Sequence, residues 1–262
     1  MDLGLENKSV LVMASSAGLG KAIAMEFARE KANVMLFSPF EDELKQAQKE
    51  IFNETGKEPS FFVGNITSPN DIKKLVAKTV DMYGPIFALV NNTGGPPAGT
   101  FDAFDDDAWQ KAYELTLLSY IRTIREVIPH MRSNGGGRIL NSTSSSIKAV
   151  LDNLILSNTF RMGVVGLSKT LSQELGKDNI LVNVIAPGRI GTTRIDYLDK
   201  VRADKACVSV EEIQKNAFKT IPLGRYGRPD EYGKLAAFLC SATNTFITGQ
   251  TVLVDGGMVK AI

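Results

Sequence analysis

The sequence of 262 residues contains only two cysteines and one histidine. Cys207 and Cys240 are too few for a disulfide framework and do not form a metal-type pair, so we interpret them as reduced thiols of a cytosolic protein. His130 has no second histidine to share a metal with, and we predict no metal site. A Ser-His-Asp triad would have to use His130 itself, for which we expect a structural role.

Charge of one sign and long apolar runs are also scarce. The formal net charge is +1, and no long run of like charge occurs, which argues against a nucleic-acid footprint or a polybasic membrane patch. No stretch of about 18 apolar residues is present, and Met1–Val10 has no apolar signal core. We therefore expect a soluble, cytoplasmic protein without nucleic-acid or membrane partners.

The chain does contain a regular alternation of apolar strand-length segments and helix-length segments. This pattern is typical of right-handed strand–helix–strand units, and it predicts an α/β fold with a doubly wound, parallel, seven-stranded sheet in one domain, residues 1–262. The expected strands are Ser9–Met13, Asn33–Phe37, Ser60–Val63, Ile86–Val90, Arg138–Asn141, Ile180–Ile185 and Thr251–Val254. The expected helices are Lys21–Lys31, Glu41–Thr55, Asn70–Tyr83, Asp105–Arg132, Asn153–Gly176 and Asp230–Cys240.

Two segments depart from this rhythm. Thr193–Pro222 is polar, contains one short helical stretch at Val210–Lys219 and returns no strand. We predict a substrate lid or loop there, although disorder in the free protein fits the same composition.

Asp105–Asp107 begins the long helix, where three acids cap the helix dipole or bind a metal; capping is the favoured interpretation.

The turn after the first strand, Ala14–Gly20, resembles a phosphate-binding turn. Gly18 and Gly20 allow a ligand to approach the backbone, and the following helix offers free N–H groups to a phosphate. The first glycine of the usual pattern is replaced by Ala14, which weakens the signal. Ser38–Phe40 ends the second strand with neither an acid to repel a 2′-phosphate nor an arginine to pair with it. NAD and NADP both remain open, and the missing carboxylate favours NADP.

Several motifs in a fixed order make the chain similar to the short-chain dehydrogenase/reductase family over essentially its whole length. The matching residues are Gly18-Leu19-Gly20, Asn91-Asn92-Thr93-Gly94, Arg138-Ile139 with Asn141–Ser144, Asn183 with Pro187-Gly188, Ile221–Arg225, and Thr248–Gln250 with Asp255–Gly257. The resemblance implies a Rossmann-type fold, a bound NAD or NADP, and a homo-tetramer or dimer. The cofactor-binding residues that it implies are Ala14, Ser16, Gly18, Leu19, Gly20, Ser38, Asn65, Ile66, Asn91, Thr93, Gly94, Arg161, Pro187, Gly188, Ile190 and Thr192.

The family's reaction interconverts a carbonyl and an alcohol with a tyrosine as acid/base, a lysine four positions later, a serine and an asparagine. Aligned on Gly163–Leu171, these four positions correspond here to Ser157, Arg161, Ser144 and Thr116, which we expect to form the catalytic site. A serine hydroxyl is far less acidic than a phenol and shorter by a ring, and arginine stays protonated. The resemblance thus implies cofactor binding without the standard proton transfer.

Two other side chains are weaker candidates for the proton donor. Lys148 is expected to be a solvated loop residue, and Tyr120 is expected to be a packing residue of the long helix. We predict an atypical oxidoreductase acting on a carbonyl, alcohol, imine or activated alkene of a small nonpolar substrate. An NAD(P)-binding sensor or partner subunit without redox turnover is the alternative, and a lyase or dehydratase on the same fold is a more remote one.

Overall fold

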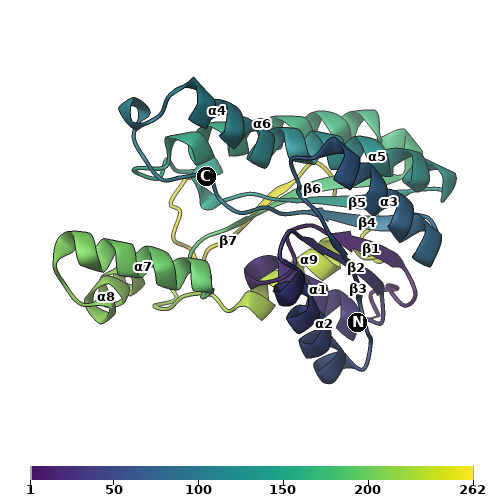
Figure 1. Ribbon diagram of the computed structural model, residues 1–262, viewed down its shortest axis with the longest axis horizontal. Helices are drawn as coiled ribbons and strands as arrows, with labels where there is room; N and C mark the ends of the chain where they lie inside the picture. Colours follow the sequence, from purple (N-terminus) through teal and green to yellow (C-terminus); the bar gives the residue numbers. More distant parts are fainter. Residues whose placement is uncertain (1, 262) are drawn as a thin grey trace.

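The computed structural model describes residues 2–261, and its seven strands form one parallel sheet in the order β3-β2-β1-β4-β5-β6-β7 (Figure 1). The strands are β1 (Ser9–Val12), β2 (Asn33–Ser38), β3 (Ser60–Val63), β4 (Ile86–Asn91), β5 (Gly137–Ser142), β6 (Ile180–Pro187) and β7 (Thr251–Val254). The predicted doubly wound, seven-stranded parallel sheet is confirmed, because β1 lies between β2 and β4 and the order reverses there.

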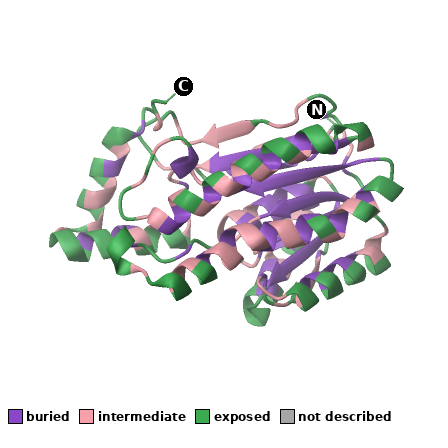
Figure 2. Ribbon diagram, turned by 90° about the horizontal axis from the view of Figure 1, so that it is seen from above, coloured by how far each residue is buried: buried purple, intermediate pink, exposed green. Residues whose placement is uncertain are grey.

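Helices cover both faces of the sheet. They are α1 (Gly18–Arg29), α2 (Glu41–Thr55), α3 (Pro69–Tyr83), α4 (Asp106–Tyr113), α5 (Ser119–Ser133), α6 (Ile155–Glu174), α7 (Thr193–Ala206), α8 (Val210–Thr220) and α9 (Pro229–Leu239). In Figure 1, α1, α2 and α9 lie on one face, whereas α3, α5 and α6 lie on the other. The inner strands are buried, whereas the edge strands β3 and β7 are only partly buried, and the helices are exposed on their outer sides (Figure 2).

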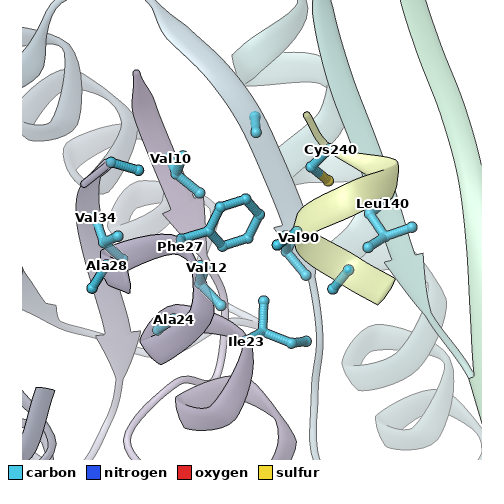
Figure 3. Packing of buried hydrophobic residues seen from close by; sticks show 14 of the residues in the cluster. Val10, Val12, Ile23, Ala24, Phe27, Ala28, Val34, Val90, Leu140 and Cys240 are labelled. Atoms are coloured by element: carbon cyan, nitrogen blue, oxygen red, sulfur yellow. The ribbon is translucent and has the colours of Figure 1, made fainter. Parts of the chain in front are cut away.

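Side-chain alternation along β1 explains why both faces are covered. Val10 and Val12 belong to the core under α1 and α9, whereas Leu11 belongs to the core under α3 and α5. Phe27 of α1 packs among these valines, and Cys240 at the end of α9 lies in the same cluster (Figure 3). Burying a side chain such as Phe27 contributes roughly 1.5–3 kcal/mol to folding.

Two helical predictions need correction. The expected helix Asp105–Arg132 is divided into α4, a π-helical segment at Glu114–Leu118, and α5. The excursion Thr193–Pro222 contains two helices, α7 and α8, where the sequence predicted only the second. α7 is polar on most of its surface, so its apolar periodicity is weak, and it is held by buried polar contacts instead.

The acidic turn before α4 caps the helix as expected. Asp105 is the N-cap residue, and its carboxylate accepts a hydrogen bond of 2.9 Å from the Ala108 N–H. Within residues 2–261, no group of three or more His, Cys, Asp or Glu side chains is arranged to hold a metal ion. Nor does any helix in this range combine the length and apolar character needed to cross a membrane.

Candidate functional site

The predicted site residues lie at the carboxyl edge of the sheet, next to the point where the strand order reverses. β1, β4, β5 and β6 run parallel, so the turns that follow them gather at one edge. In open α/β sheets, ligands bind at this edge. The remaining question is which side chains face the open space and which ones hold the scaffold together.

The turn after β1 is shaped by close packing against α1. A Cβ at Gly20 would lie 2.1 Å from the Ala14 carbonyl oxygen, so only glycine fits there. Gly18 has a φ of 55°, and Ala14 has a φ of 46° despite its side chain. The N-cap residue Ala17 makes no side-chain cap, so it leaves the N–H groups at the start of α1 unoccupied. This helix start therefore remains available to an anion.

A cavity of about 340 Å³ lies beside this turn and brings together seven of the residues predicted to bind a cofactor. These are Ala14, Ser16, Ser38, Asn65, Ile66, Thr93 and Gly94. Gly18 and Thr192 line a neighbouring cavity of about 330 Å³ on the outer side of α1. Ala17 borders both cavities, so the start of α1 separates the two spaces.

Glu43 also lines the first cavity, and the sequence analysis missed it. The Ser16 hydroxyl lies 2.8 Å from the Glu43 Oε2 atom and 3.0 Å from the Ser38 hydroxyl. An acid that contacts the adenine ribose is expected at the end of the second strand, whereas Glu43 reaches the cavity from the first turn of α2. The run of three acids in that turn, residues 41–43, was the available signal.

Asn91 does not face the cavity with its side chain. It is fully buried, its amide donates to Asn141 Oδ1 at 2.9 Å, and its Oδ1 accepts from the Thr123 hydroxyl at 2.6 Å. Asn141 in turn donates to the Ser168 hydroxyl at 2.8 Å. This chain of buried hydrogen bonds joins β4, β5, α5 and α6, so the side chain of Asn91 serves the scaffold.

The loop after β6 is packed tightly against its neighbours. A Cβ at Gly188 would lie 2.6 Å from the Asp255 Cβ, and Ile190 is buried against Gly227. Pro187 ends β6 in register with Val254 of β7. Of the residues predicted in this loop, Thr192 lines the second cavity. Leu19, at the start of α1, packs partly against the core.

Ser144 and Ser157 present hydroxyl groups from two segments that pack together, the 3₁₀ turn Ser145–Ile147 and α6. Ser144 Oγ accepts a hydrogen bond of 3.2 Å from the Ser146 N–H, which leaves its own proton free to donate. Ser157 Oγ likewise accepts from Arg161 Nε at 3.2 Å. The oxygen atoms of both hydroxyls are therefore engaged, and both are set up as donors.

Arg161 is a buried cation without an acidic partner. It is 7% exposed, and its Nη1 donates to the Ser142 carbonyl oxygen at 3.3 Å. Among residues 2–261, no carboxylate lies within ion-pair distance of its guanidinium. A buried charge without a counterion is costly, so this place suits an anionic or electron-rich ligand.

The other catalytic candidates are turned away from such a ligand. The Thr116 hydroxyl is fully buried in the π-helical segment and donates to the Ala112 carbonyl oxygen. Tyr120 is buried and donates to the Ser142 carbonyl oxygen at 2.8 Å, and burial raises its pKa to about 12 although the nearby Arg161 lowers it. Lys148 is exposed to solvent. The expectations of a packing role for Tyr120 and a solvated Lys148 are confirmed.

The α7–α8 segment is held to the loop after β6 by a buried carboxylate. Asp199 of α7 is fully buried and accepts from Arg189 at 3.2 Å, from Arg202 at 3.4 Å and from the Tyr226 hydroxyl at 2.6 Å. Burial raises the pKa of Tyr226, and its hydrogen bond to Asp199 raises it further. A Cβ at Gly95 would lie 3.6 Å from the Arg194 guanidinium, so α7 begins beside the loop after β4.

Comparison with known proteins adds a family to this geometry. Residues 13–259 match the family model described as enoyl-(acyl carrier protein) reductase. The 3-oxoacyl-(acyl-carrier-protein) reductase FabG of Thermotoga maritima is 32% identical over 97% of this chain and 99% of its own length. L-sorbose reductase from Gluconobacter frateurii, solved with NADPH and L-sorbose, superimposes with a TM-score of 0.95 at 30% identity, covering all of both chains. Actinorhodin polyketide ketoreductase, solved with NADPH, superimposes with a TM-score of 0.92 at 30% identity, covering 97% of each chain.

Proposed function

The chain belongs to the short-chain dehydrogenase/reductase family, and we propose that it is an NAD(P)-dependent oxidoreductase. Its substrate would be the carbonyl, alcohol, imine or activated alkene of a small, nonpolar compound. The observation that carries the proposal is the buried Arg161 guanidinium, which donates to the Ser157 hydroxyl and to the Ser142 carbonyl oxygen at the ligand-binding edge of the sheet, two residues before Ser144. The NADPH bound in two solved relatives gives further support.

The residues at this edge fit a dinucleotide. The cavity around Ser16, Ser38 and Asn65 suits an adenosine, and the uncapped start of α1 at Gly18 suits the phosphates. Arg161 and the loop from Pro187 to Thr192 would hold the nicotinamide end. When bound, the nicotinamide supplies or accepts the hydride.

We propose that Ser157 and Arg161 occupy the positions at which the family carries its tyrosine and lysine. Ser144 and Ser157 each have a free hydroxyl proton to donate to a substrate oxygen. Arg161 stabilises negative charge on that oxygen, but none of the three groups readily gives up a proton near neutral pH. Their contribution is therefore electrostatic stabilisation of an oxyanion, and water supplies the proton.

Other parts of the molecule suggest the setting of this reaction. The α7–α8 segment, residues 193–222, would act as the lid over the substrate. We propose a homo-oligomer, tetramer or dimer, because aromatic residues gather on the outer side of α4 and α6, and Phe246 is 97% exposed before β7. The two free thiols, Cys207 and Cys240, support a cytoplasmic protein.

A dinucleotide-binding protein without turnover, such as a sensor or partner subunit, is the second candidate. It is supported by the hydroxyl and the guanidinium at positions 157 and 161, because neither replaces the phenol as an acid. This candidate predicts tight binding of NADH or NADPH and no consumption of either.

The test combines binding with turnover. NADH and NADPH are titrated by fluorescence, and then ketones, imines and activated alkenes are screened for nicotinamide consumption. We expect Arg161→Met to lower kcat about 100-fold, because it removes the charge that stabilises the oxyanion. Arg125→Met on the exposed face of α5 is the control and should leave kcat unchanged. No binding at millimolar concentration refutes the proposal, and binding without turnover favours the sensor.

A further inference from the structure

Glu43 brings a negative charge into the cavity that suits the adenosine. It lies in the first turn of α2, where the helix dipole stabilises a carboxylate, and Ser16 donates a hydrogen bond of 2.8 Å to its Oε2 atom. Ser16 also lies 3.0 Å from the Ser38 hydroxyl, so the two serines and Glu43 form one polar cluster on the wall of the cavity. Pro39 and Phe40, between Ser38 and α2, make the adjoining wall apolar.

The neighbouring cations do not offset this charge. Among the described residues that line the cavity, Glu43 alone carries a charged side chain. Two cations that α1 presents toward α2 are already paired with other glutamates of α2. Lys21 lies 2.6 Å from Glu50, and Arg29 lies 2.8 Å from Glu54. On α2 itself, Lys45 lies 2.8 Å from a Glu41 carboxylate oxygen.

We propose that Glu43 makes the protein select NADH over NADPH, an inference that rests on the proposed function. A carboxylate beside the adenine ribose accepts hydrogen bonds from free hydroxyls, whereas it repels a 2′-phosphate. No lysine or arginine lines the cavity among the described residues, so the repulsion is not offset there. Because Glu43 is exposed, solvent weakens the repulsion, and we expect a preference of about tenfold rather than an absolute one.

This selection differs from the one that an acid at the end of the second strand provides. Ser38 ends β2 here, and the negative charge reaches the cavity from a helix and is oriented by Ser16 of the turn after β1. Glu43 would therefore act together with Ser16: the hydroxyl fixes the carboxylate in the cavity, and the carboxylate provides the discrimination.

The test measures dissociation constants of NADH and NADPH for the full-length protein and for Glu43→Gln. Glutamine keeps the length and an oxygen that accepts from Ser16, but it removes the charge. We expect the wild type to bind NADH about tenfold more tightly than NADPH, and Glu43→Gln to bind NADPH about tenfold more tightly than the wild type does. The dissociation constant of NADH should change by less than about threefold.

Glu41→Gln is the matched control, because Glu41 lies in the same turn of α2 but does not line the cavity. It should leave the ratio of the two dissociation constants unchanged. Equal or tighter binding of NADPH by the wild type, or an equal shift of both constants in Glu43→Gln, would overturn the selectivity while leaving the oxidoreductase proposal intact. If the wild type binds neither dinucleotide, the proposed function fails and the selectivity fails with it.

Discussion

Ala14 has a conformation that favours glycine. Its φ is 46°, a left-handed backbone that costs a residue with a Cβ roughly 1–2 kcal/mol, and it lies in the turn that packs against α1. Replacing Ala14 by glycine removes this strain but also increases the freedom of the unfolded chain, which offsets part of the gain. We expect Ala14→Gly to raise the free energy of unfolding by about 1 kcal/mol and the melting temperature by about 2–4 °C, measured by thermal denaturation.

The same substitution elsewhere provides the control. Ala22 lies within α1 in a regular helical backbone, so Ala22→Gly should lower the free energy of unfolding by about 1 kcal/mol. If the free energy of unfolding rises in Ala14→Gly and falls in Ala22→Gly, the backbone angle at Ala14 is the cause. A loss of stability in both variants would show that the left-handed turn carries no strain.

Sequence reasoning located most of the cavity because short motifs mark turns after strands. Ser16, Ser38, Asn65 and Gly94, which were predicted to bind a cofactor, line one cavity. Glu43 was not predicted, because the chain folds back from β2 into α2 and so brings this later residue beside Ser16. Asn91 belongs to a motif, but only the structure shows that its side chain is used within the protein core. Motifs therefore identify the turn, whereas the direction of each side chain depends on packing.

At the scale of elements, segments with a clear apolar pattern were predicted better than those without one. β3 and β7 have the predicted bounds, because short apolar runs have few alternatives. The π-helical segment Glu114–Leu118 leaves no mark in the apolar spacing, since it inserts one wider turn into a continuous helix. α7 was missed because long-range contacts to Asp199 hold it, and periodicity does not report such contacts.

Asp199 therefore offers a test of how the α7–α8 segment is held. Asp199→Asn removes the negative charge between Arg189 and Arg202, and the two guanidinium groups then repel each other. Because both arginines are partly exposed, we expect a loss of about 2 kcal/mol in the free energy of unfolding, below that of a fully buried pair. Cleavage by trypsin within residues 193–222 should accelerate about tenfold, since the segment opens more often.

Asp196 lies on the same helix with its side chain exposed, and Asp196→Asn serves as the reference for any general effect of charge removal in α7. Its cleavage rate should match that of the wild type, and its denaturation midpoint should fall only slightly, because an acid in the first turn of α7 interacts favourably with the helix dipole. If trypsin cleaves Asp199→Asn at the wild-type rate, apolar contacts rather than this carboxylate keep α7 and α8 in place.

For the molecule as a whole, the two faces of the sheet depend on separate cores. The core between the sheet and α1, α2 and α9 includes Cys240, which lies at the end of α9 on the side of Val90 and Leu140 (Figure 3). Burial raises the pKa of this thiol from 9.0 to about 12, although the nearby Arg138 lowers it. The buried proton of this thiol, like those of the buried tyrosines Tyr120 and Tyr232, therefore links the stability of the fold to alkaline pH.

The raised pKa of Cys240 determines the pH range in which this thiol contributes to stability. Below about pH 9, the Cys240 thiol is protonated in both states and its contribution to stability is complete. Above this pH the unfolded chain releases the proton whereas the folded protein keeps it, so stability is lost as the pH rises toward the folded pKa of about 12. As the pH rises from about 9 to about 11, the free energy of unfolding of Cys240→Ala should fall by about 2 kcal/mol less than that of the wild type, measured by urea denaturation. Cys207 is an exposed thiol, and Cys207→Ala should show the wild-type dependence of unfolding free energy on pH. The same pH dependence in all three proteins would refute the linkage.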